Sequence, residues 1–143
     1  MLVNPLMKAF VAGHVGLFRL TGGRFGGKIG KLPVVLLTTT GRKTGKERTV
    51  PVGSFEDQGD VVVVASFAGS PQHPAWFNNL TANPNVTAQL GAQPFAARAE
   101  VTTGAERERL WKKIIDIAPN FGEYQKKTTR EIPIVRLKRV QVN

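Results

Sequence analysis

The sequence has no cysteine and only two histidines among its 143 residues, and these shortages exclude several kinds of site. Without cysteine there are no disulfides, no thiolate metal ligands and no cysteine nucleophile. His14 and His73 stand apart from each other and from any carboxylate cluster, so we expect no metal site. No serine lies in a G-x-S-x-G setting, which disfavours a hydrolase. If the protein is an enzyme, a bound organic cofactor is expected to carry the chemistry.

Acidic residues are also scarce, since 10 of them face 20 lysines and arginines and leave a formal net charge of +10. Such a charge attracts nucleic acid, an anionic membrane or an anionic small molecule, and does not by itself decide among them. The cations occur in several separate segments rather than in one tail. This distribution favours an anion site to which several segments contribute. The lack of cysteine favours a cytoplasmic setting.

No long uninterrupted apolar run is present. The segment from Leu2 to Leu20 is broken by polar residues, so it is too polar to span a membrane, and no cleavage pattern of a secretory signal follows it. Its apolar residues recur near the helical period and predict an amphipathic helix over about 5–20. This helix either packs on its own domain or lies on a membrane, where Lys8 and Arg19 would meet anionic headgroups.

The most informative stretch is Thr38–Arg48, which follows an apolar run that predicts a buried strand. It combines four cations, several hydroxyl groups and two glycines in one turn, and a second strand pattern comes directly after it. Glycine allows the backbone to turn back, and arginine offers a planar fork that matches phosphate or carboxylate oxygens. The pattern predicts an anion site at the end of a sheet. The alternative is a solvated hairpin that carries surface cations.

Apolar and β-branched runs predict strands at about 33–40, 47–55, 60–67, 85–91, 94–102 and 132–139. The continuous run Val61–Ala65 indicates a strand that is buried on both faces. A short helix should follow Pro74, and a longer one should follow Thr103, where Glu106 gives the spacing of a capping box. With so little room for parallel crossovers, the chain is expected to form one mainly β domain over 1–143, an antiparallel barrel with flanking helices.

Two aromatic residues are candidates for the site. Trp76 is either a core residue beneath the barrel or a wall against a planar cofactor near the basic turn. Tyr124, the one tyrosine of the sequence, lies between the last long helix and the final strand. It is either a surface tyrosine in a loop or a lid hydroxyl that donates a hydrogen bond to a ligand.

Taken together, these segments resemble the deazaflavin-dependent nitroreductase family, a group of split β-barrel proteins that use reduced coenzyme F(420). Two motifs carry the resemblance jointly, the turn Thr39–Gly45 and the segment His73–Leu80. It extends over nearly the whole chain, from Phe18–Arg24 to Thr129–Pro133. The fold that it implies is a split β-barrel of the FMN-binding-like type.

The resemblance implies a reductase in which coenzyme F(420) passes a hydride to a hydrophobic acceptor, a quinone or a nitroaromatic compound. The basic turn would hold the phosphate and acidic tail of the coenzyme, and the following strand and short helix would flank its rings. Tyr124 would be the hydrogen-bond donor to the acceptor or a lid over it. The implied coenzyme-binding residues are Arg42, Lys43, Thr44, Arg48, Pro51, Val52, Ser66, Ala75 and Trp76. A lipid-soluble quinone would suit a cytoplasmic protein at the inner face of the cell membrane.

The chain departs from the family in a few places. Many members carry a lysine and paired glycines where this sequence has Phe67–Gly69, and tyrosines are common at the positions of Phe77 and Phe121. These differences remove one charged contact to the coenzyme, so we do not expect activation of nitroimidazole drugs.

Other interpretations fit the same sequence. One is an FMN-dependent reductase on the same barrel, since both cofactors carry phosphate. Another is a non-enzymatic basic barrel for single-stranded nucleic acid, but such proteins stack bases on exposed aromatic residues, and few aromatics here lie outside apolar settings. No nucleic-acid partner is therefore expected. A carrier of the coenzyme without turnover also fits, and the sequence does not determine the oligomeric state.

Overall fold

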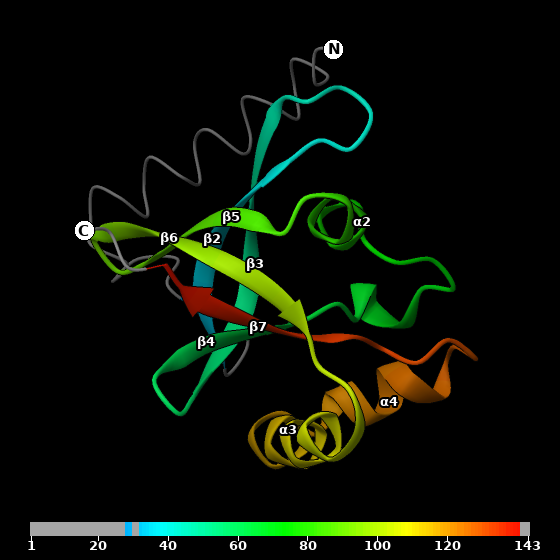
Figure 1. Ribbon diagram of the computed structural model, residues 1–143. Coiled ribbons are helices and arrows are strands. Elements are labelled where there is room, and N and C mark those ends of the chain that lie inside the picture. The colour runs from blue at the N-terminus through cyan, green and yellow to red at the C-terminus, as the bar shows by residue number, and fades with distance from the viewer. Residues whose placement is uncertain (1–27, 30–31, 141–143) are drawn as a thin grey trace.

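The computed structural model describes residues 28–29 and 32–140, and Figure 1 shows their arrangement. The predicted N-terminal helix over about 5–20 and most of the glycine-rich segment that follows it lie outside the described residues. Within the described part of the chain, no helix is long and apolar enough to cross a membrane.

Six strands form a closed antiparallel barrel, as predicted. Their order around the barrel is β2 (Leu32–Thr40), β3 (Glu47–Asp57), β4 (Asp60–Val64), β7 (Ile134–Arg139), β6 (Gln93–Val101) and β5 (Asn85–Leu90). The barrel closes where β5 pairs with β2, with Ala88 opposite Leu37. A short strand, β1 (Lys28–Ile29), pairs with β2. Each barrel strand therefore has a partner on both sides, which protects the edges of the sheet.

Within residues 32–140, three α-helices and one 3₁₀ turn accompany the barrel. The 3₁₀ turn η1 (Phe67–Gly69) and helix α2 (Ala75–Ala82) follow β4, whereas α3 (Gly104–Ile117) and α4 (Asn120–Lys126) lie between β6 and β7. Figure 1 shows α3 and α4 together below the barrel, with α2 nearer to the connection between β2 and β3. Helix α4 occupies a segment that the sequence indicated as a loop.

Strand β4 separates two apolar cores because its side chains alternate between its faces. Val63 points into the barrel interior, where it joins Leu37 and Leu80. Val62 and Val64 point outward and pack against α3. The prediction that this strand is buried on both faces is confirmed for Val62, Val63 and Val64, whereas Val61 near its start is half-buried.

A buried ion-pair network fastens α3 to the barrel. Arg136 of β7 donates to Asp57 at 2.6 Å, and Arg109 of α3 donates to both oxygens of the same carboxylate at 2.7 and 2.9 Å. The hydrogen bonds from Arg109, and then those from Arg136, hold the pKa of the Asp57 carboxyl well below its usual value. The predicted capping box was wrong, because Glu106 accepts a hydrogen bond from Arg136 and Thr103 begins α3 without a side-chain cap.

Candidate active site

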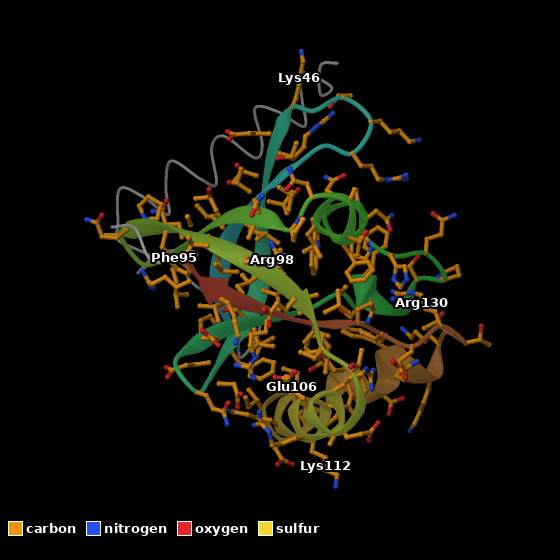
Figure 2. All side chains as sticks on the ribbon, viewed as in Figure 1. Lys46, Phe95, Arg98, Glu106, Lys112 and Arg130 are labelled. Atoms are coloured by element: carbon orange, nitrogen blue, oxygen red, sulfur yellow. The ribbon has the colours of Figure 1, made fainter. Side chains whose placement is uncertain are left out.

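The basic turn between β2 and β3 has a backbone that its own hydrogen bonds define. Gly41 donates to the carbonyl of Lys46 at 2.7 Å, and Gly45, at φ +72°, donates to the carbonyl of Gly41 at 2.8 Å. A Cβ atom on Gly41 would lie 2.8 Å from the Thr44 hydroxyl and 3.1 Å from the Lys46 carbonyl, so a larger residue there would displace the Thr44 side chain. The side chains of Arg42 and Lys43 extend from this frame into solvent. Figure 2 shows Lys46 at the tip of the turn, at the opposite end of the molecule from Lys112.

Asn79 connects the basic turn to helix α2. Its Oδ1 accepts a hydrogen bond from the backbone N–H of Arg42 at 3.1 Å, and its Nδ2 donates to the hydroxyl of Thr39, also at 3.1 Å. The Asn79 side chain is buried, so each bond replaces one that water would otherwise make. Our sequence prediction assigned no role to Asn79. One feature of the sequence could have indicated a role for Asn79. Asparagine is unfavourable inside helices, and here it stands next to the apolar Leu80 in a predicted helix.

A cavity of about 440 Å³ lies beside the barrel, between α2, the segment after β4, and α4. Its volume is within the range of small-molecule sites. The lining residues that bear on function are Pro51 and Val52 of β3, Ser66 and Phe67 after β4, Trp76 of α2 and Tyr124 of α4. These residues come from four separate segments of the sequence. The wall is mostly apolar and aromatic, as expected for a site that holds a ring system.

The residues predicted for the site thus fall into two groups. Pro51, Val52, Ser66, Trp76 and Tyr124 line the cavity. The others, Arg42, Lys43, Thr44 and Arg48, belong to the turn, and Ala75 is exposed at the start of α2, outside the lining, where Pro74 contributes instead. Strand β3 joins the two groups, because three residues of strand, about 10 Å, separate Arg48 from Pro51.

The two aromatic candidates lie on opposite walls. Trp76 is half-buried, packs against the barrel core and meets Phe77 edge to face, with 6.5 Å between ring centroids. Tyr124 is half-buried on α4, and its ring lies edge-on to Phe121 at 5.3 Å. Tyr124 lies on a helix, not in the surface loop that one of its two sequence interpretations assumed. Placing it on a helix fixes the direction of its side chain more firmly than a loop would.

Arg130, in the segment that leaves α4, donates hydrogen bonds to the chain after β4. Its guanidinium binds the carbonyls of Ser66 at 2.7 Å, Ser70 at 2.9 Å and Ala65 at 3.1 Å. Its Nη1 also donates to Nδ1 of His73 at 3.1 Å. Burial, and secondly the charge of Arg130, lower the pKa of His73, so the imidazole stays neutral and accepts this bond.

The donor set matches an organic anion better than a metal. In the part of the chain that the structure describes, no three His, Cys, Asp or Glu side chains gather to hold a metal ion. The turn offers guanidinium, ammonium and hydroxyl groups on a backbone that its own hydrogen bonds hold in place. The cavity next to it offers apolar walls and an indole ring. Such residues fit a cofactor with a planar ring system and a charged tail.

The closed antiparallel barrel, with its cationic turn and adjoining cavity, defines a split β-barrel protein of the FMN-binding-like class. The chain belongs to the F(420)H(2)-dependent quinone reductase family, whose family model matches residues 11–139. Family membership confirms three predictions, namely the resemblance, the enzyme class and coenzyme F(420) as the cofactor.

Individual relatives and solved structures support this family membership. The F(420)H(2)-dependent quinone reductase Rv1261c of Mycobacterium tuberculosis is 37% identical over 130 residues, which cover 88% of this chain and 87% of that protein. The solved structure of an F(420)-H(2)-dependent reductase, FDR-A, is 43% identical, has a TM-score of 0.68, and aligns over 74% of this chain and 94% of its own. A further structure, described as a domain-swapped dimer, is 37% identical with a TM-score of 0.70, over 92% and 99% of the two chains.

Proposed function

We propose that this chain reduces a quinone-type acceptor in the cavity, with reduced coenzyme F(420) as the source of the hydride, and that nitroaromatic compounds are further acceptors. The observation that carries the proposal is one strand, β3, that joins a cationic turn to an apolar cavity. When bound, a deazaflavin donates a hydride from a ring carbon, so the chain needs neither a metal nor a nucleophile of its own. Its residues have to bind, orient and exclude water.

In this proposal the basic turn holds the phosphate and the acidic tail. Arg42 and Lys43 are exposed and able to follow a flexible tail, whereas Thr44 and Arg48 are half-buried nearer the strands. Charge-assisted hydrogen bonds to oxyanions are stronger than neutral ones. The ordered backbone of the turn limits the entropy that binding would cost.

The cavity walls orient the rings and the acceptor. Pro51, Val52 and Trp76 supply apolar and aromatic surface, and Ser66 adds a polar group next to them. Ala75 lies at the start of α2, one residue before Trp76, and is proposed to border the coenzyme from outside the cavity. A dry, shaped site keeps the hydride donor and the acceptor close and prevents loss of the hydride to other reactants.

Tyr124 is proposed to donate a hydrogen bond to the oxygen of the acceptor as that oxygen gains charge. Replacement of Tyr124 by phenylalanine removes only the hydroxyl, so turnover should fall by about tenfold or more while the coenzyme affinity stays within about twofold. If Tyr124→Phe turns over normally and Tyr124→Ala does not, the ring acts as a lid and the hydroxyl has no role.

A reduction assay tests the proposed function. Purified protein is mixed with reduced coenzyme F(420) and a water-soluble naphthoquinone, and the oxidised coenzyme is followed by its absorbance. We expect protein-dependent oxidation that saturates with quinone, and a large loss with the double variant Arg42→Ala, Lys43→Ala. Oxidation at the rate of the protein-free control would contradict the proposal, and the same assay with reduced FMN tests the alternative cofactor.

We also propose that residues 1–143 form one domain, whose N-terminal helix over about 5–20 contacts the inner face of the cell membrane. The helical recurrence of apolar residues, with Lys8 and Arg19 within the same segment, supports this placement. Deletion of the first 20 residues should move the protein from the membrane fraction to the supernatant after cell lysis. An unchanged distribution would rule out the membrane contact.

A further inference from the structure

The segment after β4, which forms one wall of the cavity, has an unfavourable backbone conformation. Phe67 and Ala68 have φ angles of +46° and +53°, in the left-handed region that residues with a Cβ atom rarely adopt, and Gly69 follows at +81°. The cost for each non-glycine residue corresponds to a roughly five- to thirtyfold lower population. Two such residues in succession therefore require contacts that hold them in place.

Arg130 provides these contacts. Its bonds to the carbonyls of Ala65, Ser66 and Ser70 bracket the left-handed residues on both sides. The planar guanidinium reaches these carbonyls from three separate nitrogen atoms, whereas the three N–H groups of a lysine all leave from one nitrogen atom. In Figure 2, Arg130 lies beside the loop that leads to α2.

No carboxylate pairs with Arg130 among the described residues, in contrast to Arg136, which binds three. The partners of Arg130 are carbonyl oxygens and the neutral ring of His73. Because these partners are neutral, Arg130 forms no ion pair with them and acts on them through hydrogen bonds alone. Its effect is to fix the direction of the peptide groups that it binds.

The left-handed segment also contacts the backbone of Tyr124. A Cβ atom on Gly69 would lie 2.7 Å from the carbonyl oxygen of Tyr124, so the left-handed segment rests directly on α4. Gln125, the next residue, holds the backbone around Arg130, because its Nε2 donates to the Arg130 carbonyl at 2.8 Å and its Oε1 accepts from Ile132 at 3.0 Å. Arg130, the segment after β4 and α4 thus depend on one another.

We propose that Arg130 is a positioning residue of the active site: it holds Phe67–Gly69 in the left-handed conformation and thereby sets the shape of the cavity next to Tyr124. This inference rests on the proposed function, in which the cavity is the place of reduction. Loss of Arg130 should impair the placement of ring and acceptor while leaving the basic turn intact. Turnover should fall more than coenzyme affinity.

Limited proteolysis of the protein without coenzyme tests the contact itself. The Phe67 side chain is 56% exposed, and chymotrypsin cleaves after exposed aromatic residues in mobile segments. We expect cleavage after Phe67 to be about tenfold faster in Arg130→Met, with a smaller increase in Arg130→Lys. Arg136→Lys is the control matched to Arg130→Lys, because it makes the same exchange at an equally bonded arginine outside the cavity and should leave cleavage after Phe67 at the wild-type rate. Cleavage of Arg130→Met at the wild-type rate would overturn the proposal.

The Ala68→Gly substitution separates positioning from general stability, since glycine adopts positive φ at no cost. The kcat with glycine at position 68, divided by the kcat with alanine there, should be about fivefold larger in the Arg130→Met background than in the Arg130 background. Absence of this rescue would overturn the proposal. If even the wild-type protein reduces no quinone, the proposed function fails, and the proteolysis still decides whether Arg130 holds the segment.

Discussion

The two side-chain hydrogen bonds of Asn79 allow us to predict how much the Asn79→Ala substitution weakens coenzyme binding. Asn79→Ala leaves the N–H of Arg42 and the hydroxyl of Thr39 without their buried partner, at the cost of two hydrogen bonds of 3.1 Å each. At about 0.5–1.5 kcal/mol for each bond, the turn loses about 1–3 kcal/mol of its attachment to α2. A bound coenzyme that has to restore this attachment would bind about five- to 150-fold more weakly.

Fluorescence titration with oxidised coenzyme F(420) measures this loss, and the neighbouring residue provides the control. Asn78 lies on the same helix, and its side chain makes no hydrogen bond within the described residues. Asn78→Ala should therefore bind the coenzyme like the wild type. If Asn79→Ala and Asn78→Ala bind equally well, the attachment of the turn to α2 does not contribute to the site.

Three further predictions concern stability. Asp57→Asn weakens the buried pair with Arg136 and the half-exposed pair with Arg109. Loss of the buried pair should lower the free energy of unfolding in urea by about 3–5 kcal/mol, and a loss under about 1 kcal/mol would contradict the role of this network. The folded-state pKa of Asp57 lies below its ordinary value of 3.8, so on acidification the unfolded chain binds a proton at Asp57 before the folded chain does. Stability should therefore fall as the pH drops below about 4, and it should fall less steeply in Asp57→Asn. Burial and Arg130 lower the pKa of His73 from 6.5, so stability should also fall as the pH drops below about 6.5, and His73→Gln should remove this step from unfolding curves recorded at several pH values.

Most of the barrel could be predicted from the sequence because its strands carry strong local signals. The β-branched run of β4 predicts a strand from a few consecutive residues. The sequence of the turn before it is equally local, and Gln58 and Gly59 in that turn both have positive φ angles. Helix α4 had no comparable signal, since it has seven residues and contains Gly122 just after Pro119. Its formation depends on packing against α3 and η1, which the sequence does not reveal.

The site divides in the same way. The basic turn was predictable because its cations, hydroxyls and glycines are consecutive. The contacts of Asn79 and Arg130 were not predictable, because those of Asn79 join residues 37 and 40 positions apart and those of Arg130 join residues 57–65 positions apart. The strain at Phe67 and Ala68 was also invisible, since neither residue type suggests a positive φ angle.

The central claim is that the turn and the cavity bind a deazaflavin coenzyme. The measurement that tests it most directly is a fluorescence titration of the purified chain with oxidised coenzyme F(420), in parallel with FMN and a single-stranded oligonucleotide. We predict saturable binding of the deazaflavin alone. In the double variant Arg42→Ala, Lys43→Ala the affinity should fall by at least about tenfold, a modest loss for two cations because both are exposed and screened by solvent. Equal binding of FMN or the oligonucleotide, or an unaltered affinity in the double variant, would contradict the account.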